Sequence, residues 1–278
     1  MTAGPRIMGI VNVTPDSFSD GGRYLDPGAA VQHGLALVAQ GAAILDVGGE
    51  STRPGAETVG EAVELERVVP VLEGLRGVGA QLSIDTSKAS VAAAGLRAGA
   101  TLVNDVTALR GDPAMAGIVA DAGVDCCLMH MLGEPRTMQD DPRYDDVVSE
   151  VKAFLQARMA AAVEAGIAEE RILLDPGIGF GKTLEHNLEL VRRLDELVAL
   201  GRPIVFGASR KSFLGQITGA ALDGRVVATV AVNVLAYERG ASVFRVHDVH
   251  PTRDGLEVAA ATFSRPWPGT TPTMTPTR

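Results

Sequence analysis

The residues best suited to chemistry lie in the segment 172–182, where a short apolar run leads into a glycine-rich loop. The apolar run predicts a buried parallel strand, which Pro176 and the glycine after it bring to an end. Asp175 is therefore expected at the carboxyl end of that strand. The loop glycines let a ligand approach the backbone closely, while Phe180 offers an exposed ring and Lys182 an ammonium group. Together these groups suit a flat, polar, nitrogen-rich ligand better than a sugar or a lipid.

Two common glycine motifs do not fit this loop. A phosphate-binding P-loop requires a glycine at the position of Pro176, and the dinucleotide-binding motif requires one at the position of Lys182. A purely structural turn is the alternative, because glycine is the usual turn residue. The rest of the chain repeats the same design, which favours a ligand-binding loop.

A strand with a polar end, followed by a loop and a helix, recurs eight times along the chain. Apolar runs predict strands at 7–13, 43–47, 82–84, 102–103, 126–129, 172–174, 204–206 and 243–246. Helical patterns are found at 28–40, 61–76, 89–98, 113–122, 145–165, 184–200, 226–239 and near 253–263. The glycines expected to end helices are Gly41, Gly99, Gly123, Gly166, Gly201 and Gly240.

Eight strand–helix units in about 265 residues fit a single (β/α)8 TIM barrel with its active site at the carboxyl-terminal mouth of the strands. In the alternative, a doubly wound open sheet, only strands near the switch point would face a ligand. Polar residues end all eight strands here, which favours the barrel. Residues 1–264 form this predicted domain, and the Pro- and Thr-rich segment 265–278 is expected to be disordered. The strand ends carry Asn12, Asp46, Asp85, Asn104 with Asp105, His130, Asp175, the trio 209–211, and Arg245 with His247.

The composition is that of an ordinary globular protein, with 46% hydrophobic and 21% charged residues among 278. The formal net charge of −9 argues against a nucleic-acid partner, so cations for an anionic ligand must be concentrated locally. No apolar run reaches the ~18 residues of a membrane span, and the start of the chain lacks the layout of a signal peptide. We therefore expect a cytoplasmic protein with no membrane association. The candidate cations are Arg53, Arg210, Lys211, Arg245 and His247.

Two loops are rich in polar residues and glycine, namely 14–22 after the first strand and 48–56 after the second. Such loops at a barrel mouth are candidate lids, and plain solvent-exposed connections are the alternative. Asp46 is expected to support the second loop from beneath rather than to contact a ligand.

Strand alternation assigns several further residues to structural roles. The adjacent Cys126 and Cys127 should point to opposite faces, which favours a buried pair over a disulfide or a metal site. By the same alternation, Met129 is expected to point inward, leaving His130 structural or supporting. The spacing between His33, His186 and His250 is not that of metal ligands, so we expect no zinc site at these histidines.

Seven motifs, in order, carry a resemblance to the dihydropteroate synthases over about residues 6 to 263. They are NVTPDSFSDGG (12–22), GGESTRPG (48–55), DT (85–86), NDV (104–106), DPGIGFGK (175–182), SRKS (209–212) and RVHD (245–248). The resemblance implies a folate-pathway transferase that joins 6-hydroxymethyl-7,8-dihydropterin diphosphate to 4-aminobenzoate, assisted by Mg2+. It also implies a homodimer and competition between sulfonamides and 4-aminobenzoate.

The resemblance further implies three groups of substrate-binding residues. The pterin would lie deep in the barrel against Asp85, Asn104, Met129, Asp175, Gly207 and Lys211. The diphosphate would meet Asn12, Thr52, Arg53, Arg245 and His247, with Mg2+ held by Asn12 and phosphate oxygens. The 4-aminobenzoate would contact Thr52, Arg53, Pro54, Phe180, Lys211 and Ser212, with its carboxylate near the start of the next helix.

The family mechanism breaks a carbon–oxygen bond to form a stabilised pterin-methyl cation, in an SN1-type step. Asp85, Arg53 and Lys211 are the expected catalytic residues, with Asp85 placed near the cation. The two lids are expected to close over bound diphosphate, which would make substrate binding ordered. A pterin-binding methyltransferase of a related barrel group and a non-catalytic pterin-binding relative are the alternatives. The trio 209–211 and the lids argue against the first, and Asn12, Arg53 and Lys211 against the second.

Overall fold

The computed structural model describes residues 4–14, 26–52, 55–56, 58–134 and 136–262. Most of the first candidate lid, Arg53 and Pro54 in the second, and the segment 265–278 lie outside these ranges. What the sequence predicts for them stays a prediction.

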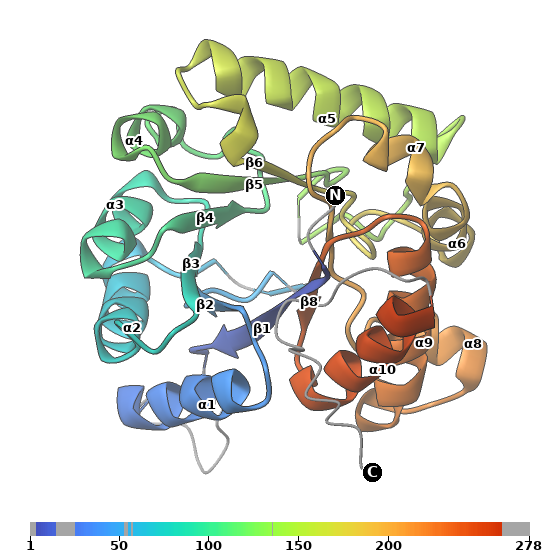
Figure 1. The fold of residues 1–278 in the computed structure, drawn as a ribbon. Helices are drawn as coiled ribbons and strands as arrows, with labels where there is room; N and C mark the ends of the chain where they lie inside the picture. Colours follow the sequence, from blue (N-terminus) through green and yellow to red (C-terminus); the bar gives the residue numbers. More distant parts are fainter. Residues whose placement is uncertain (1–3, 15–25, 53–54, 57, 135, 263–278) are drawn as a thin grey trace, which may run out of the picture.

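Eight parallel strands form the centre of the molecule, and helices surround them on the outside (Figure 1). Hydrogen-bonded neighbours follow the order β6-β5-β4-β3-β2-β1-β8-β7. A bridge between Leu174 and Ile204 joins the two ends of this sheet, so the strands close into the predicted (β/α)8 barrel. The strands are β1 (Arg6–Asn12), β2 (Ile44–Gly48), β3 (Gln81–Asp85), β4 (Leu102–Asp105), β5 (Asp125–Met129), β6 (Ile172–Asp175), β7 (Val205–Phe206) and β8 (Val243–Val246).

Most helices begin and end close to their predicted limits. Asp26 and Asp146 cap α1 and α5 by accepting hydrogen bonds from backbone N–H groups of the first turn. All six glycines predicted to end helices have positive φ, between 60° and 118°, in the left-handed conformation that commonly ends a helix. The helices are α1 (Pro27–Ala39), α2 (Glu61–Gly74), α3 (Ala89–Ala98), α4 (Met115–Ala122), α5 (Val147–Glu164), α6 (Leu184–Arg192), α7 (Leu194–Val198), α8 (Ser212–Thr218), α9 (Val226–Glu238) and α10 (Val249–Thr262).

The helix expected at 184–200 is instead divided into α6 and α7. Arg193, at the break, has φ −114° and ψ 28°, and its guanidinium bonds Asp146 at 3.0 Å and Glu196 at 2.7 Å. The short α8 and the 3-10 segments η1 (Glu169–Arg171) and η2 (Leu222–Arg225) have no counterpart among the helices predicted from periodicity. Each is too short to show a clear 3.6-residue repeat.

No single helix in the described ranges is long and apolar enough to cross a membrane. One pair, Ser212–Thr218 with Leu222–Glu238, meets the criteria of length and composition, but it is bent by 87°.

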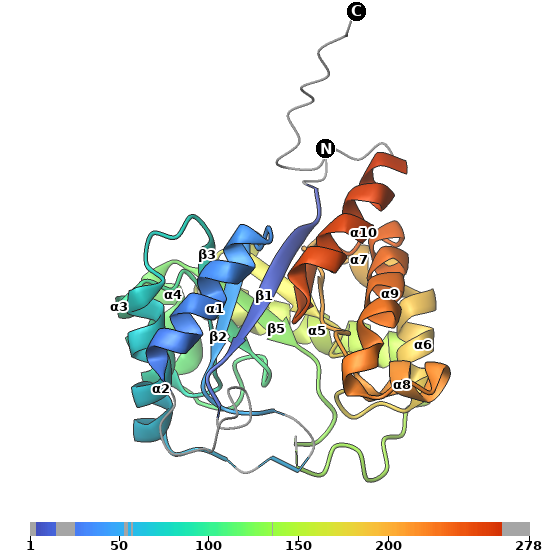
Figure 2. The same ribbon diagram turned by 90° about the horizontal axis from the view of Figure 1, so that it is seen from below.

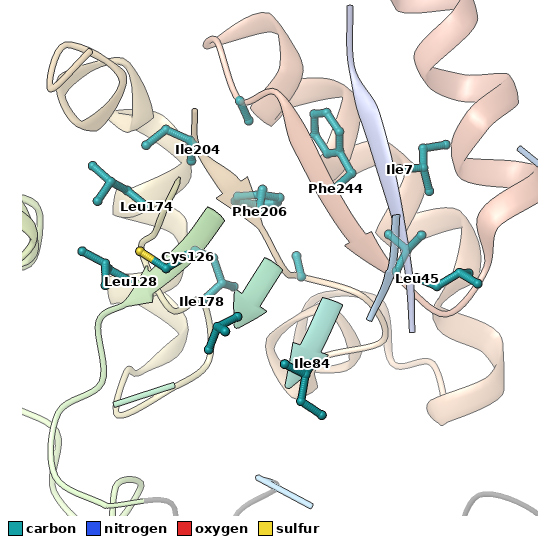
Figure 3. Packing of buried hydrophobic residues seen from close by; sticks show 14 of the residues in the cluster. Ile7, Leu45, Ile84, Cys126, Leu128, Leu174, Ile178, Ile204, Phe206 and Phe244 are labelled. Carbon is teal, nitrogen blue, oxygen red and sulfur yellow. The ribbon is translucent and has the colours of Figure 1, made fainter. Parts of the chain in front are cut away.

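Alternation along the strands creates two apolar cores. Inward-facing residues fill the barrel, and outward-facing residues pack against the helices in a larger cluster (Figure 3). Cys126 belongs to the outer cluster and Cys127 to the inner one, so the prediction of a buried pair on opposite faces is confirmed. The inner apolar layer consists of Met8, Ile44, Leu102, Cys127, Leu173, Val205 and Val243.

The loop after β4 is held by the buried carboxylate of Asp105. This carboxylate accepts hydrogen bonds from the backbone N–H groups of Thr107 at 2.8 Å and Leu109 at 2.9 Å. The loop contains two non-glycine residues with positive φ, Ala108 at 54° and Leu109 at 60°, a conformation that is unfavourable for residues with a side chain. The hydrogen bonds of Asp105, and one from Arg158 to the carbonyl of Ala108 at 2.9 Å, offset this strain.

We expect Asp105→Ala to lower the free energy of unfolding by about 2–4 kcal/mol, because it leaves buried backbone donors without an acceptor and releases the strained turn. Urea denaturation followed by circular dichroism measures the change. Asp121→Ala, which removes an exposed carboxylate from α4, is the matched control and should have little effect. Equal stabilities of the two variants would contradict this role for Asp105.

Candidate active site

The candidate active site lies at the carboxyl ends of the strands. Figure 2 shows β1 running from the amino terminus towards the edge of the barrel at which the loops that follow the strands gather. The register of the strands determines which side chains reach the interior at this edge.

Between the inner apolar layer and the carboxyl ends of the strands, most inward-facing side chains are polar. Asp85 pairs in register with Asn104, and Asn104 pairs with Cys127 of the inner layer. Met129, two residues after Cys127, pairs with Asp175. Residues paired in register share a face of the sheet, so all these side chains point into the barrel. The inward-facing residues at the mouth are Asn12, Asp46, Asp85, Asn104, Met129, Asp175, Gly207, Arg245 and His247.

Arg245 lies between two carboxylates at the centre of this group. Its Nε atom is 2.6 Å from Asp46 Oδ2, and its Nη2 atom is 2.6 Å from Asp85 Oδ2. Burial by itself would lower the pKa of Arg245, but Asp46 and Asp85 together raise it above its ordinary value. The guanidinium therefore carries a permanent positive charge inside the barrel mouth.

Asp46 contacts the floor of the site, and none of its hydrogen bonds in the described ranges reaches the second loop. Its carboxylate accepts hydrogen bonds from Ser83 Oγ at 2.6 Å and Asn104 Nδ2 at 3.0 Å, in addition to the ion pair with Arg245. The prediction that Asp46 supports the second loop from beneath is therefore wrong. Strand alternation indicates this inward position, because Asp46 lies two residues before Gly48, which pairs with the inward-facing Asp85.

The carboxyl groups of Asp85 and Asp175 both have pKa values above the ordinary value of an aspartate. Burial and the neighbouring Asp46 carboxylate together raise the pKa of Asp85 to about 7, against the lowering effect of Arg245. Burial also raises the pKa of Asp175 above its ordinary value, against the lowering effect of Lys211. Asp175 Oδ1 accepts a hydrogen bond from Gly177 N at 2.6 Å, which fixes the carboxyl group at the strand end.

Lys211 supplies the ammonium group that faces Phe180. Its Nζ atom lies 4.4 Å from the centroid of the Phe180 ring and donates a hydrogen bond to the carbonyl of Ile178. Burial lowers the pKa of Lys211 to about 7, although Asp175 opposes this change. The cation, the ring and the Asp175 carboxyl group thus come from two different strand–loop units.

Lys182 does not face a ligand, contrary to the prediction. Its side chain is 3% exposed, with Nζ 2.9 Å from His130 Nδ1 and 3.0 Å from the carbonyl oxygen of Phe180. Phe180 is half-buried rather than exposed, and packs against the inward-facing Met129. The buried His130 ring lies against Phe154, with the ring centroids 4.8 Å apart, which is consistent with the predicted structural or supporting role.

The residues predicted to bind the diphosphate differ in whether their side chains are available to a ligand. Asn12 ends β1, and its side-chain amide has no hydrogen-bond partner within the described ranges. His247 Nδ1 is 3.0 Å from Ser209 Oγ, which orients the imidazole. Arg210, a candidate cation, is instead paired with Asp248 by two hydrogen bonds of 2.8 and 2.6 Å. Arg53 lies outside the described residues.

Two of the residues predicted for 4-aminobenzoate lie at the edges of the site. Ser212 is exposed at the start of α8. Thr52 lines a cavity of about 970 Å³ beside the mouth, together with Glu50 and Ser51 of the second loop and Met131 of the loop after β5. Pro54 lies outside the described residues.

A sequence profile described as "Pterin binding enzyme" matches residues 8–247. Over 263 residues the chain is 52% identical to the dihydropteroate synthase of Mycobacterium leprae (strain TN). This alignment covers 92% of this chain and 93% of the relative.

Solved structures of such enzymes share the fold. A Yersinia pestis dihydropteroate synthase in a sulfonamide drug complex superposes with a TM-score of 0.90 and 46% identity, over 94% of this chain and 95% of the other. The Xanthomonas albilineans enzyme with 4-aminobenzoic acid gives a TM-score of 0.89 and 50% identity, over 95% and 94%. The same enzyme with 7,8-dihydropteroate gives 0.86 and 47%, over 95% of both chains. The chain therefore belongs to the pterin-binding enzyme family and, within it, to the dihydropteroate synthases.

Proposed function

We propose that this protein condenses 6-hydroxymethyl-7,8-dihydropterin diphosphate with 4-aminobenzoate to form 7,8-dihydropteroate and diphosphate, in folate biosynthesis. The observation that carries the proposal is the inward-facing ring of carboxyl, amide and cationic groups at the mouth of a dihydropteroate synthase barrel. The complexes of the Xanthomonas enzyme with 4-aminobenzoic acid and 7,8-dihydropteroate support the choice of second substrate and product.

The floor of the barrel mouth suits the pterin ring. A pterin edge presents an amide and an exocyclic amine, which Asn104 and Asp175 can match with complementary donors and acceptors. Each hydrogen bond to a charged group contributes about 1.5–3 kcal/mol, enough to orient a small ring. At Gly207 an added Cβ would lie 3.8 Å from Asp175 Oδ2, so the absence of a side chain leaves room beside this carboxyl group. Met129 and Lys211 complete the proposed pterin contacts.

The diphosphate is proposed to lie above the pterin, near Asn12, Thr52, Arg53, Arg245 and His247. The permanent charge of Arg245 attracts the anion, although Asp46 and Asp85 already neutralise part of that charge. The imidazole of His247, held by Ser209, can donate a hydrogen bond to a phosphate oxygen.

Asn12 fits the proposed contact with Mg2+. Its amide has no hydrogen-bond partner in the described ranges, and an amide oxygen is a hard ligand of the kind that Mg2+ prefers. The described residues contain no group of three or more His, Cys, Asp or Glu side chains that could hold a metal. A single protein ligand is compatible with Mg2+, which usually binds through substrate phosphates and water as well. When bound, Mg2+ would neutralise charge on the diphosphate.

In the proposed reaction the carbon–oxygen bond to diphosphate breaks, and positive charge develops on the pterin methylene group. The ionised carboxylate of Asp85 stabilises that charge electrostatically, without forming a covalent intermediate. The amine nitrogen of 4-aminobenzoate then forms the new carbon–nitrogen bond and loses a proton.

The second substrate is proposed to place its ring near Phe180 and its carboxylate near Lys211 and Ser212. The 4.4 Å approach of Lys211 to the Phe180 ring brings an apolar surface and a cation together, as a benzoate requires. Pro54, Thr52 and Arg53 are the proposed contacts from the second loop. The sulfonamide complex of the Yersinia enzyme supports the proposal that sulfonamides compete for this position.

The proposal also includes a cytoplasmic location, which the hydropathy of the sequence predicts, and a homodimer, which the family resemblance implies. Light scattering of the purified protein measures its mass in solution. A monomeric mass of 28.9 kDa would contradict the dimer.

The direct test of the function is diphosphate release by the purified protein with Mg2+, the pterin diphosphate and 4-aminobenzoate, each omitted in turn. Release that requires all three, with 7,8-dihydropteroate as product, is the expected result. Pterin binding without turnover would instead indicate a non-catalytic relative.

The variant Asp175→Asn should weaken pterin binding by about 10- to 100-fold, because it replaces a charged hydrogen-bond acceptor by a neutral amide. The fold should persist, since the Asn oxygen can still accept from Gly177 N. Calorimetric titration with the pterin diphosphate measures the dissociation constant. Asp195→Asn, an exposed change on α7, is the control, and an unchanged constant for Asp175→Asn would refute the assignment.

We expect kcat/KM for the pterin diphosphate to depend on pH as a narrow bell with its maximum near pH 7. Burial raises the pKa of Asp85 to about 7 and lowers that of Lys211 to about 7. Asp85 acts ionised, so activity falls below its pKa, and Lys211 acts protonated, so activity falls above its pKa. Asp85→Asn should remove the acidic limb and Lys211→Arg the alkaline limb. A wild-type profile that is flat from about pH 6 to about pH 8 would contradict both assignments.

A further inference from the structure

Lys182 and His130 are two buried titratable side chains that the proposed reaction does not use. Their exposed fractions are 3% and 5%. Lys182 Nζ lies 2.9 Å from His130 Nδ1 and 3.0 Å from the carbonyl oxygen of Phe180. The contacts therefore form a chain from the end of β5, through Lys182, to the backbone of Phe180.

The loop that carries Phe180 packs tightly against the end of β5. A Cβ added at Gly177 would lie 1.8 Å from the carbonyl oxygen of His130, and one added at Gly181 would lie 2.6 Å from that of Leu132. Both glycines also have positive φ, 67° and 62°. Only residues without a side chain allow this close approach.

Other side chains secure the backbone of the same loop. Tyr144 Oη donates to the carbonyl of Gly181 at 2.8 Å. Gln139 Nε2 donates to the carbonyl of Gly179 at 2.5 Å, and Asn187 Oδ1 accepts from Gly179 N at 2.7 Å. Lys182 completes this set with its hydrogen bond to the carbonyl of Phe180, the residue whose ring lies against Lys211.

The position of Phe180 determines the surroundings of Lys211. The ammonium of Lys211 lies against the Phe180 ring and donates to the carbonyl of Ile178 in the same loop. The ring itself packs against the buried cluster of Val106, Met129, Met131 and Met138. A displacement of the Phe180 backbone would therefore move both an apolar surface and a cation.

The contact between Lys182 and His130 is suited to a fixed structural arrangement rather than to a change of protonation state. Burial, together with the neighbouring Lys182, lowers the pKa of His130 to about 2, so the imidazole is neutral and can accept a hydrogen bond at Nδ1. Burial also lowers the pKa of Lys182 well below its ordinary value, with a contribution from Lys211. The edge contact of His130 with Phe154 holds the imidazole ring in this orientation.

We propose that Lys182 and His130 are positioning residues for the aromatic amine substrate, acting through Phe180. The hydrogen bond from Lys182 holds the Phe180 carbonyl, and His130 holds Lys182, so that the Phe180 ring and Lys211 stay in place before the substrate arrives. This inference rests on the proposed function, and it adds a set of side chains that set the KM for 4-aminobenzoate without contacting it.

The test is steady-state kinetics of Lys182→Met, which keeps an unbranched apolar stem but removes the donor. We expect the KM for 4-aminobenzoate to rise about 10-fold or more, equivalent to about 1.4 kcal/mol or more. The dissociation constant of the pterin diphosphate, measured by calorimetry without the second substrate, should stay within about 2-fold of the wild-type value. Lys152→Met, the same substitution on α5, is the control and should change neither quantity.

A pair of substitutions at His130 separates positioning from general damage to the fold. Asn places an acceptor oxygen where His130 carries Nδ1, so His130→Asn should retain a KM near the wild-type value. His130→Leu has no acceptor and should reproduce the rise seen for Lys182→Met. Because these variants act on a different residue, they keep the proposal testable if Lys182→Met does not fold.

The outcomes distinguish this inference from the proposed function. If wild-type protein does not form 7,8-dihydropteroate, the proposed function fails and the inference fails with it. If wild-type protein is active but Lys182→Met and His130→Leu keep the wild-type KM, only the inference is overturned. An equal weakening of pterin binding in these variants would also overturn it, because that result indicates a general loss of structure at the mouth.

Discussion

The ion pairs of Arg245 with Asp46 and Asp85 are the interaction on which the barrel mouth depends. They join β8 to β2 and β3 across the barrel interior, with two contacts of 2.6 Å. Burying a guanidinium is unfavourable unless carboxylates and hydrogen bonds satisfy it, and removing one partner of such a group typically costs about 3–5 kcal/mol. Asp46 is satisfied in turn by Ser83 and Asn104. The charge needed for an anionic substrate is thus stable in the free protein only because the floor of the site is acidic.

The site has a rigid part whose construction can be followed residue by residue. On the β3 and β4 side, strand register aligns the groups that we propose to read the pterin edge. On the β6 side, three left-handed glycines fold the loop after Asp175 so closely against β5 that side chains secure its backbone from several directions. The residues proposed to contact substrate and the residues that hold them are therefore distinct sets. This arrangement supports preorganisation, in which the groups are in place before the reaction begins.

Much of the architecture followed from local patterns. Short apolar runs with polar ends and helices closed by glycine predicted the eight units, and the bounds differ mainly at helix termini and at Arg193, where a single residue divides one helix into two. The alternation of Cys126 and Cys127 was predictable because a strand has a period of two. Local patterns do not reveal which cations are free to bind an anion. The sequence places Arg210 among the candidate anion-binding cations, whereas it pairs with Asp248, a partner that only the folded chain brings near.

The sequence by itself determined the fold class, the end of the barrel that carries the chemistry and the family, because these depend on periodicity and on motifs that are continuous in the chain. The tertiary structure decided which charged groups face the interior. Lys182 and Lys211 are equally plausible ligand contacts in the sequence, yet the turns at Gly177, Gly179 and Gly181 direct Lys182 towards His130 and leave the Phe180 ring to Lys211. Asp46 likewise gained its role from the register between β2 and β3. Partners distant in the sequence meet only when the barrel closes, and local patterns carry no information about that meeting.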